Sequence, residues 1–355
     1  MSGEWSLIFQ FDLSFRARWK QHRFMSSIYL ITGATGFVGG HIAEACASRG
    51  DKVRTVARVG SDTALLNRIG AEIIRGDIMD GQVVRQAVDG ANVILHCAAK
   101  VGDQGSVDDY RAINVEALRG LLEACKGKPP SRFVHMSSLG VYEARHHFGT
   151  DESEPLPATH LDAYSQTKVE ADRLAFEYQR KHNVPVVVLR PGFVYGPRDR
   201  TVLPKLIKRM TNGKVHYLGG DRRALNTIYI GNLIEAVFLA VERPGAVGQV
   251  YNLTDGEIVT KRRFFEAVSD GMELPRSKQM LPRWLAGIVV RLLERQMRRA
   301  VARGRQPILT PAQFKFLLLN LDFSIEKAKR ELGYNPRFSF DEGMRETLAW
   351  YKQNA

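Results

Sequence analysis

Short apolar runs alternate along the chain with stretches in which apolar residues recur at helical spacing. From Met25 onward, runs rich in β-branched and aliphatic residues predict strands at 28–31, 52–57, 72–75, 93–97 and 132–136. Helical patterns separate them at spacings that suit right-handed parallel crossovers, and one of these helices is expected at 110–126. The pattern therefore predicts an α/β fold built on a Rossmann doubly wound parallel sheet.

The first predicted strand leads into a glycine-rich turn. Gly33, Gly36 and Gly39 recur at every third position before a helical pattern. In such a turn the first glycine permits a tight bend, the second lets the backbone approach a pyrophosphate, and the third lets the helix pack closely on the strand. The helix N-terminus would point free N–H groups at the phosphates. An ordinary strand–turn–helix is the alternative, but the flanking strand and helix favour dinucleotide binding.

The end of the second predicted strand bears on the choice of dinucleotide. Folds that bind NAD place an acid about 20 residues after the glycine turn, where it contacts the ribose 2′-hydroxyl. This chain has Arg58 there, and the first acid that follows is Asp62. A guanidinium suits a 2′-phosphate, so we expect NADP rather than NAD; the alternative is a solvated surface arginine. After the third strand, Asp77 is expected either to accept from the adenine amino group or to cap a helix.

The candidate chemistry lies further along the chain. Ala98 and Ala99 follow the fourth strand and leave room for a ribose or nicotinamide beside the backbone. Tyr164 and Lys168 stand one turn apart in a helical pattern, so both side chains project from one face. A phenol has a pKa of about 10 and needs a nearby cation to exchange a proton near neutrality. We therefore expect Lys168 to lower the pKa of Tyr164; a stem-packing surface pair is the alternative.

Taken together, these motifs resemble the short-chain dehydrogenase/reductase superfamily in its extended branch. The resemblance runs from about residue 28 to the C-terminus and rests on TGATGFVG (32–39), GDI (76–78), HCAA (96–99), SS (137–138), YSQTK (164–168) and RPGFVYGPR (190–198). Within that branch the chain is most similar to the 3β-hydroxysteroid dehydrogenase and dihydroflavonol reductase-like group, part of the NAD-dependent epimerase/dehydratase proteins.

The resemblance implies a set of site residues. Ser138 would orient a carbonyl, Tyr164 would act as acid or base, and Lys168 would also hold the nicotinamide ribose. The segment 191–194 would meet the carboxamide through its backbone. No metal ligand is implied. The implied cofactor-binding residues are Gly33, Thr35, Gly36, Phe37, Val38, Gly39, Arg58, Asp77, Ile78, Ala98, Ala99, Tyr164, Lys168, Pro191 and Val194.

The same reading divides the chain into regions. We expect a disordered extension at 1–24, a dinucleotide-binding domain at 25–197 that is completed by 226–255, and a substrate-binding region at 198–225 and 256–355. A strand at 249–253 is expected to return to the main sheet, and Asp341 to open the last helix. Nucleotide-sugar epimerases of this branch usually place an arginine before the strand expected at 227–230. Leu225 and Asn226 stand there instead, which weakens a sugar-nucleotide interpretation.

The stretch 281–305 predicts a basic amphipathic helix. Its apolar residues recur at helical spacing, and arginines fall mainly between them. Leu292 is expected within the apolar seam of this helix. We expect the helix to pack over the substrate pocket; contact with an anionic membrane surface is the alternative.

Composition changes this picture little. The 355 residues are 44% hydrophobic and 25% charged, as in ordinary soluble globular proteins. The formal net charge is +13, but lysines and arginines are spread along the chain apart from the concentration at 291–305, so we expect no nucleic-acid partner. Cys46, Cys97 and Cys125 lie in apolar patterns without metal-type spacing. They predict a reducing, cytoplasmic location, with peripheral membrane association left open.

These inferences converge on an NAD(P)-dependent oxidoreductase. We expect hydride transfer between the cofactor and a carbonyl or secondary alcohol of an apolar small molecule of sterol, β-keto or flavonoid-like type. One alternative is a nucleotide-sugar epimerase or dehydratase. Another is a non-catalytic NADP-binding scaffold or regulator, against which the intact Ser138, Tyr164 and Lys168 speak. The expected partner is a small-molecule substrate, and a homodimer is left open.

Overall fold

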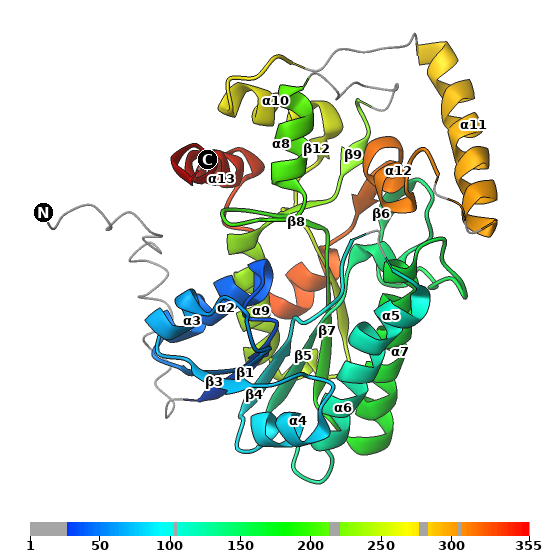
Figure 1. Ribbon diagram of the computed structural model, residues 1–355. Helices are drawn as coiled ribbons and strands as arrows, with labels where there is room; N and C mark the ends of the chain where they lie inside the picture. The colour runs from blue at the N-terminus through cyan, green and yellow to red at the C-terminus, as the bar shows by residue number, and fades with distance from the viewer. Residues whose placement is uncertain are drawn as a thin grey trace, which may run out of the picture.

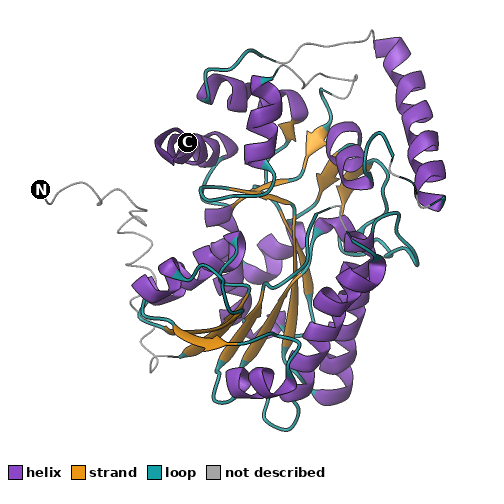
Figure 2. Cartoon of the chain, in the orientation of Figure 1, coloured by secondary structure: helices purple, strands orange, loops and turns teal. Residues whose placement is uncertain are grey.

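A parallel sheet forms the centre of the protein. The computed structural model describes residues 27–102, 105–212, 221–276, 283–303, 305 and 307–354, and within them seven strands follow the order β11-β7-β5-β4-β1-β2-β3 (Figures 1 and 2). Every pairing in this sheet is parallel. The strands are β1 (Ile28–Thr32), β2 (Lys52–Ala57), β3 (Glu72–Arg75), β4 (Val93–His96), β5 (Arg132–Met136), β7 (Val186–Pro191) and β11 (Val250–Leu253). The predicted doubly wound sheet is confirmed.

The strand order creates the place where a ligand can bind. Successive strands run outward from β1 through β2 to β3, and then outward on the other side from β4. The order therefore reverses between β1 and β4, and ligands of open α/β sheets bind at the carboxyl ends of strands at such a switch point. The strand predicted to return to the sheet is β11, which pairs with β7. The predicted extension at 1–24 lies outside the described residues.

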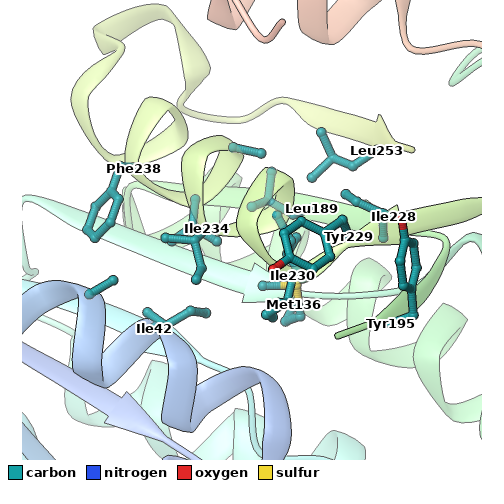
Figure 3. Packing of buried hydrophobic residues seen from close by; sticks show 14 of the residues in the cluster. Ile42, Met136, Leu189, Tyr195, Ile228, Tyr229, Ile230, Ile234, Phe238 and Leu253 are labelled. Carbon is teal, nitrogen blue, oxygen red and sulfur yellow. The ribbon is translucent and has the colours of Figure 1, made fainter. Parts of the chain in front are cut away.

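Helices cover both faces of the sheet. On one face lie α2 (Phe37–Ser48), α3 (Ala64–Arg68) and α9 (Ile230–Glu242); on the other lie α4 (Gly81–Val88), α6 (Ala117–Ala124) and α7 (Ala163–His182). Figure 3 shows Ile42 of α2 and Ile234 and Phe238 of α9 packing with Met136 and Leu189 from the strands. Because both faces are covered, most side chains of β1, β2, β4, β5 and β7 are buried and these strands are largely apolar, which is why short, mainly apolar runs predicted them.

The prediction of one continuous helix at 110–126 is wrong in two respects: the helical segment starts earlier, and a π-helical turn interrupts it. It begins as α5 (Val107–Arg111), where Ser106 and Asp109 form a capping box. A π-helical turn follows at Ala112–Glu116 before α6 begins. The wider π turn adds one residue to the turn, a feature that often marks functional sites. Hydrophobic periodicity could not reveal it because the buried positions on either side remain helical in spacing.

The remaining elements gather above the sheet in Figure 1. They form two-stranded pairs, namely β8 (Phe193–Tyr195) with β10 (Thr227–Tyr229), β9 (Ala224–Leu225) with β12 (Val259–Thr260), and β6 (His147–Thr150) with β13 (Leu321–Phe323). The helices here are α8 (Leu203–Thr211), α10 (Lys261–Gly271), α11 (Arg283–Ala302), α12 (Pro311–Leu318) and α13 (Phe340–Asn354). Short helical turns lie at Leu139–Val141, Pro244–Ala246 and Ala328–Leu332. In the described parts of the chain, no helix is long and apolar enough to cross a membrane.

The start of the last helix corrects a sequence-based expectation. The helix α13 begins at Phe340, and the Ser339 hydroxyl caps it by accepting from the Glu342 N–H at 3.3 Å. Asp341 lies in the first turn rather than at the cap. An acid in the first turn still complements the positive end of the helix.

The third glycine of the turn controls how closely α2 packs on β1. A Cβ atom at Gly39 would overlap the carbonyl oxygen of Gly33 and come within 3.0 Å of the Ala34 Cα. At Gly120 in α6, by contrast, an added Cβ would meet nothing within 4 Å. The two positions therefore make a matched pair for substitution.

We predict opposite effects of alanine at these two glycines. Gly39→Ala should lower the free energy of unfolding by about 1–3 kcal/mol, because the backbone must shift to relieve the overlap. Gly120→Ala should raise it by about 0.5–1 kcal/mol, since alanine is the better helix former. Urea denaturation measures both values, and equal effects at the two positions would contradict the packing argument.

Candidate active site

The glycine turn has the shape that a dinucleotide pyrophosphate needs. Gly33 has a positive φ of +71°, and a Cβ there would lie 2.8 Å from the Ala98 backbone nitrogen. The turn is closed by the Gly36 N–H, which donates to the Gly33 carbonyl at 3.0 Å. No side chain caps the N-terminus of α2, and its first turn carries no acid. Thr35 and Gly36 are exposed, while Phe37 and Val38 are half-buried. These residues fit a bound pyrophosphate at the positive end of the helix.

Arg58 lies where the sequence predicted a cation for the adenosine ribose. It directly follows β2 and is exposed. Arg54 is committed elsewhere, because its guanidinium donates to Glu72 at 2.8 Å and to the Ala87 and Asp89 carbonyls. Arg58 is therefore the better candidate of these two arginines to contact a 2′-phosphate.

The structure separates the two uses considered for Asp77. The helix α4 is capped by Asp80, whose carboxylate accepts from the Gln82 N–H at 2.8 Å. Asp77 is exposed, and one of its carboxylate oxygens accepts from the Met79 N–H at 2.9 Å. Asp77 is thus not the helix cap. Ile78 beside it is half-buried, which leaves this corner available to an adenine ring.

The two serines after β5 face different surroundings. Ser137 is buried, and its N–H donates to the Leu189 carbonyl at 2.7 Å. Ser138 is half-buried, and its hydroxyl oxygen accepts from the Gly140 N–H at 3.0 Å. The Ser138 hydroxyl also lies beside the Tyr164 ring, since a Cβ atom at Gly140 would be 3.3 Å from the Ser138 Oγ and 3.9 Å from the Tyr164 Cε1. The sequence-predicted Ser138 and Tyr164 are therefore brought together at the carboxyl end of β5.

Lys168 lies beneath this pair, on the next turn of α7. Its ammonium is 5.9 Å from the centre of the Tyr164 ring and donates to the Met136 carbonyl at 2.7 Å. The side chain is buried. An ammonium has three N–H donors, so this bond leaves two for other acceptors.

The expected lowering of the Tyr164 pKa is not what the protein shows. Burial raises the pKa of Tyr164 to about 12, and the nearby Ser138 hydroxyl opposes this only in part. Burial also lowers the pKa of Lys168 to about 8, although the Asp172 carboxylate acts in the opposite direction. The phenol is thus a protonated group at neutral pH, suited to donate a proton. Helical spacing showed that the two side chains share a face, but it could not show how strongly desolvation acts on each.

A buried polar cluster lies under α7, and the sequence did not reveal it. Its carboxylate, Asp172, favours the charged form of Lys168. Asp172 accepts from the Arg190 guanidinium at 3.0 Å, and both side chains are buried. Arg190 also donates to the Tyr142 hydroxyl at 2.9 Å, and Tyr142 donates to Asn252 of β11 at 2.9 Å. The cluster therefore joins α7 to strands at the edge of the sheet. A charged residue inside an apolar stretch, as at Arg190 in β7, was the signal available in the sequence.

The histidines near this cluster, His96 and His135, are buried core residues. The His96 ring stacks on His135 with ring centres 5.7 Å apart, and its Nδ1 is 2.8 Å from the Thr32 hydroxyl. Burial lowers the pKa of His96 to about 3 and holds the pKa of His135 well below its ordinary range. Both rings are therefore neutral at physiological pH.

The π turn positions a further residue that sequence reasoning passed over. The buried Asn114 side chain accepts from the Lys100 N–H at 2.7 Å and donates to the Thr167 hydroxyl at 3.0 Å. It therefore ties the loop after Ala99 to the helix that carries Tyr164 and Lys168. Ala98 and Ala99 are half-buried in this loop, and the Ala98 N–H donates to the Thr32 hydroxyl at 3.2 Å.

The segment after β7 is held from the other side of the site. The Gly192 N–H donates to the Leu253 carbonyl at 2.9 Å, and the Phe193 N–H to the Asn226 carbonyl at 2.6 Å. Pro191 is buried and Val194 is half-buried. This backbone is therefore fixed between β11 and β10, whichever group it contacts.

A bridge from α12 reaches the start of α7, the helix that carries Tyr164 and Lys168. The Lys315 ammonium donates to Asp162 at 3.0 Å and to the Ser165 hydroxyl at 2.8 Å. Asp162 is also the N-cap of α7, accepting from the Ser165 N–H at 2.7 Å. Tyr164 lies between these two residues, so α12 is connected directly to the turn that presents the phenol.

Comparison with known proteins places these features in a family. Residues 29–254 match the NAD dependent epimerase/dehydratase family. The chain is 32% identical over 339 residues to a 3 beta-hydroxysteroid dehydrogenase/Delta 5-->4-isomerase of Mycobacterium tuberculosis, covering 91% of this chain and 90% of that protein. It is 28% identical over 331 residues to a 2-alkyl-3-oxoalkanoate reductase of Shewanella oneidensis, covering 90% of this chain and 85% of that protein.

Solved structures share the fold. The crystal structure of gox2253 superposes with a TM-score of 0.76 at 25% identity and covers 93% of this chain and 99% of that one. The UDP-glucuronic acid 4-epimerase of Bacillus cereus, solved with UDP-glucuronic acid and NAD, gives a TM-score of 0.72 at 22% identity, covering 92% of this chain and 100% of that one. The fold, the motifs and the family match agree, and the chain belongs to the NAD-dependent epimerase/dehydratase family, as an oxidoreductase of the extended short-chain dehydrogenase/reductase type.

Proposed function

We propose that this oxidoreductase uses NADP(H) to reduce the carbonyl of an apolar small molecule of sterol, β-keto or flavonoid-like type. The observation that carries the proposal is the placement of Ser138 and Tyr164 side by side at the carboxyl edge of the sheet, with the Lys168 ammonium 5.9 Å from the centre of the Tyr164 ring. Relatives named as a 3-oxoalkanoate reductase and a hydroxysteroid dehydrogenase support the substrate class. The oligomeric state stays a prediction.

Tyr164 can supply the proton that such a reduction requires. A bound nicotinamide dinucleotide supplies hydride to the carbonyl carbon. Because the pKa of Tyr164 is raised to about 12, the phenol holds its proton at neutral pH and donates it to the carbonyl oxygen. Ser138 positions that oxygen by a hydrogen bond, and the ammonium of Lys168 stabilises the phenolate that remains.

The cofactor preference rests on Arg58. Its exposed guanidinium follows β2, and the neighbouring Arg54 is occupied by Glu72 and backbone carbonyls. A guanidinium binds a phosphate through charge-assisted, often bidentate, hydrogen bonds, whereas a ribose hydroxyl favours a carboxylate. This supports NADP over NAD.

The alternatives receive less support. The arginine expected of a nucleotide-sugar epimerase is replaced by Leu225, which is buried in β9 and pairs with Val259. The nearby Arg223 donates to the Leu318 carbonyl at the end of α12. A non-catalytic scaffold would not require Ser138, Tyr164 and Lys168 to be gathered in one place. NADPH oxidation measured against ketones, β-keto acids and steroids, together with isomer formation from UDP-sugars, tests the proposal. Isomer formation from a UDP-sugar with no NADPH oxidation by any of the ketones would overturn it.

We predict that Tyr164→Phe removes the proton donor while preserving cofactor binding. Turnover should fall roughly 10²- to 10⁴-fold, since general acid catalysis contributes about that much, and the NADPH dissociation constant should change little. Tyr178→Phe is the matched control, because Tyr178 lies on the same helix but bonds Glu123 away from the site. Turnover within a factor of two of wild type in Tyr164→Phe would exclude the assigned role.

A second prediction concerns the 2′-phosphate. Arg58→Asp should weaken NADPH binding by about 1.5–3 kcal/mol, the usual value of hydrogen bonds to a charged group, with repulsion added. NADH binding should be unchanged or improved. Arg85→Asp, at an exposed arginine of α4, is the charge-matched control. Fluorescence titration measures both cofactors, and an unchanged NADPH-to-NADH affinity ratio refutes the role of Arg58.

A third prediction follows from the lowered pKa of Lys168. A lysine with a pKa of about 8 is charged below that pH and loses its proton as the pH rises through it. The kcat/KM for ketone reduction should therefore decline above about pH 8. In Lys168→Arg the guanidinium stays protonated, so this decline should move to higher pH even if the overall rate is lower. The same alkaline decline in both proteins would show that another group causes it.

A further inference from the structure

The helix α11 has one covered side and one uncovered side. It lies at the edge of the molecule, on the right in Figure 1. Met297 and Ala300 are buried, and Met297 packs with Phe314 and Leu318 of α12. Val290 and Leu293 are partly buried against the same cluster. This inner side confirms that the helix packs on its neighbour through an apolar seam.

The uncovered side is not simply polar. Leu292, expected in the seam, is instead 57% exposed, and Ile288 one turn earlier is 51% exposed. Met297 follows Ile288 by about two and a half helical turns, so the two side chains point in opposite directions from the helix axis. Ile288 and Leu292 therefore occupy the middle of the outward face. Periodicity counted them among the apolar positions, but it could not show that the neighbouring elements leave them uncovered.

Arginines flank these aliphatic residues on the outward face. Arg291, Arg295, Arg299 and Arg303 recur at every fourth position, and all are exposed. Residues at this spacing lie in one row along a helix, about one turn apart. Glu294, the acidic residue within 283–303, forms an ion pair with Arg298, whose guanidinium nitrogen lies 2.9 Å from the carboxylate oxygen. The row thus carries positive charge that this acid does not offset.

The loop after the helix extends the aliphatic stripe. Ile308 is 71% exposed, and its N–H donates to the side chain of Gln296 at 3.3 Å. Gln296 lies one turn beyond Leu292, so Ile288, Leu292 and Ile308 follow one another along the helix. Exposed aliphatic residues of this kind, bordered by arginines, form a surface that is apolar at its centre and cationic at its rim.

We propose that this face of α11 is a docking surface for a membrane containing anionic phospholipid. The arginine row would contact the phosphate groups, and Ile288, Leu292 and Ile308 would enter the boundary between headgroups and acyl chains. The helix would lie in the plane of the interface, in agreement with its mixed outward face. A nucleic acid also attracts arginines, but it offers no apolar layer for the central aliphatic stripe.

Sedimentation with vesicles tests the proposal on the full chain. Vesicles of phosphatidylcholine alone are compared with vesicles of equal parts phosphatidylcholine and phosphatidylglycerol, at low and high salt. The wild-type protein should pellet with the anionic vesicles at low salt and be released at high salt. Changing Arg291, Arg295, Arg299 and Arg303 to Gln should weaken binding at least about 100-fold.

Two further variants separate membrane docking from other causes. Ile288→Ser with Leu292→Ser removes the aliphatic centre and should weaken vesicle binding by about 10-fold or more, without lowering thermal stability. Changing Arg68, Arg85, Arg180 and Arg330 to Gln removes the same charge from exposed positions elsewhere and should leave vesicle binding near wild type. NADPH binding should be unchanged in all three variants.

The outcomes that overturn the proposal are distinct. No pelleting of the wild-type protein with anionic vesicles would end it. If the two arginine variants lose vesicle binding to the same extent, the binding depends on overall charge rather than on α11. Vesicle binding that survives the Ser substitutions, together with salt-sensitive binding to duplex DNA, would assign the arginine row to nucleic acid. None of these results depends on the proposed enzymatic substrate.

Discussion

The buried ammonium of Lys168 is the constraint on which the arrangement around the site depends. A charge moved from water into the protein interior costs several kcal/mol unless it is paired and hydrogen-bonded. Here the Met136 carbonyl accepts one hydrogen bond at 2.7 Å, and the Asp172 carboxylate on the next turn of α7 supplies opposite charge. Asp172 is in turn held by Arg190 at 3.0 Å. The position of α7 on the sheet is therefore set by electrostatics as well as by packing.

The same cluster connects parts of the chain that are far apart in sequence. Through Tyr142 and Asn252, the ion pair of Asp172 and Arg190 reaches β11, the strand that returns to the sheet after the first elements of the upper region. Removing one partner of such a pair leaves a buried charge uncompensated, which is far more damaging than losing an exposed pair. The helix α7 and the edge strand β11 are thus stabilised together.

The sequence predicted the elements whose signals are local. The parallel sheet is covered on both faces, so β2 and β5 bury most of their side chains, and the short runs at 52–57 and 132–136 predicted their bounds closely. The spacing of Tyr164 and Lys168 predicted that they share a helix face. What it could not predict depends on partners distant in the chain: the role of Arg190, the π turn at Asn114, the desolvation that raises the pKa of Tyr164, and the exposure of Leu292. The periodicity of α11 identified apolar positions, but only the packed neighbours determine which of them are covered.

The bridge from Lys315 to Asp162 and Ser165 joins α12 to the first turn of α7, about 150 residues earlier in the chain. The helix that carries Lys315 also packs against α11, while its lysine holds the turn that presents the Tyr164 phenol. A substitution in α12 or α11 that displaces Lys315 would therefore also shift this turn. The orientation of the phenol thus depends on a part of the chain that lies outside the central sheet.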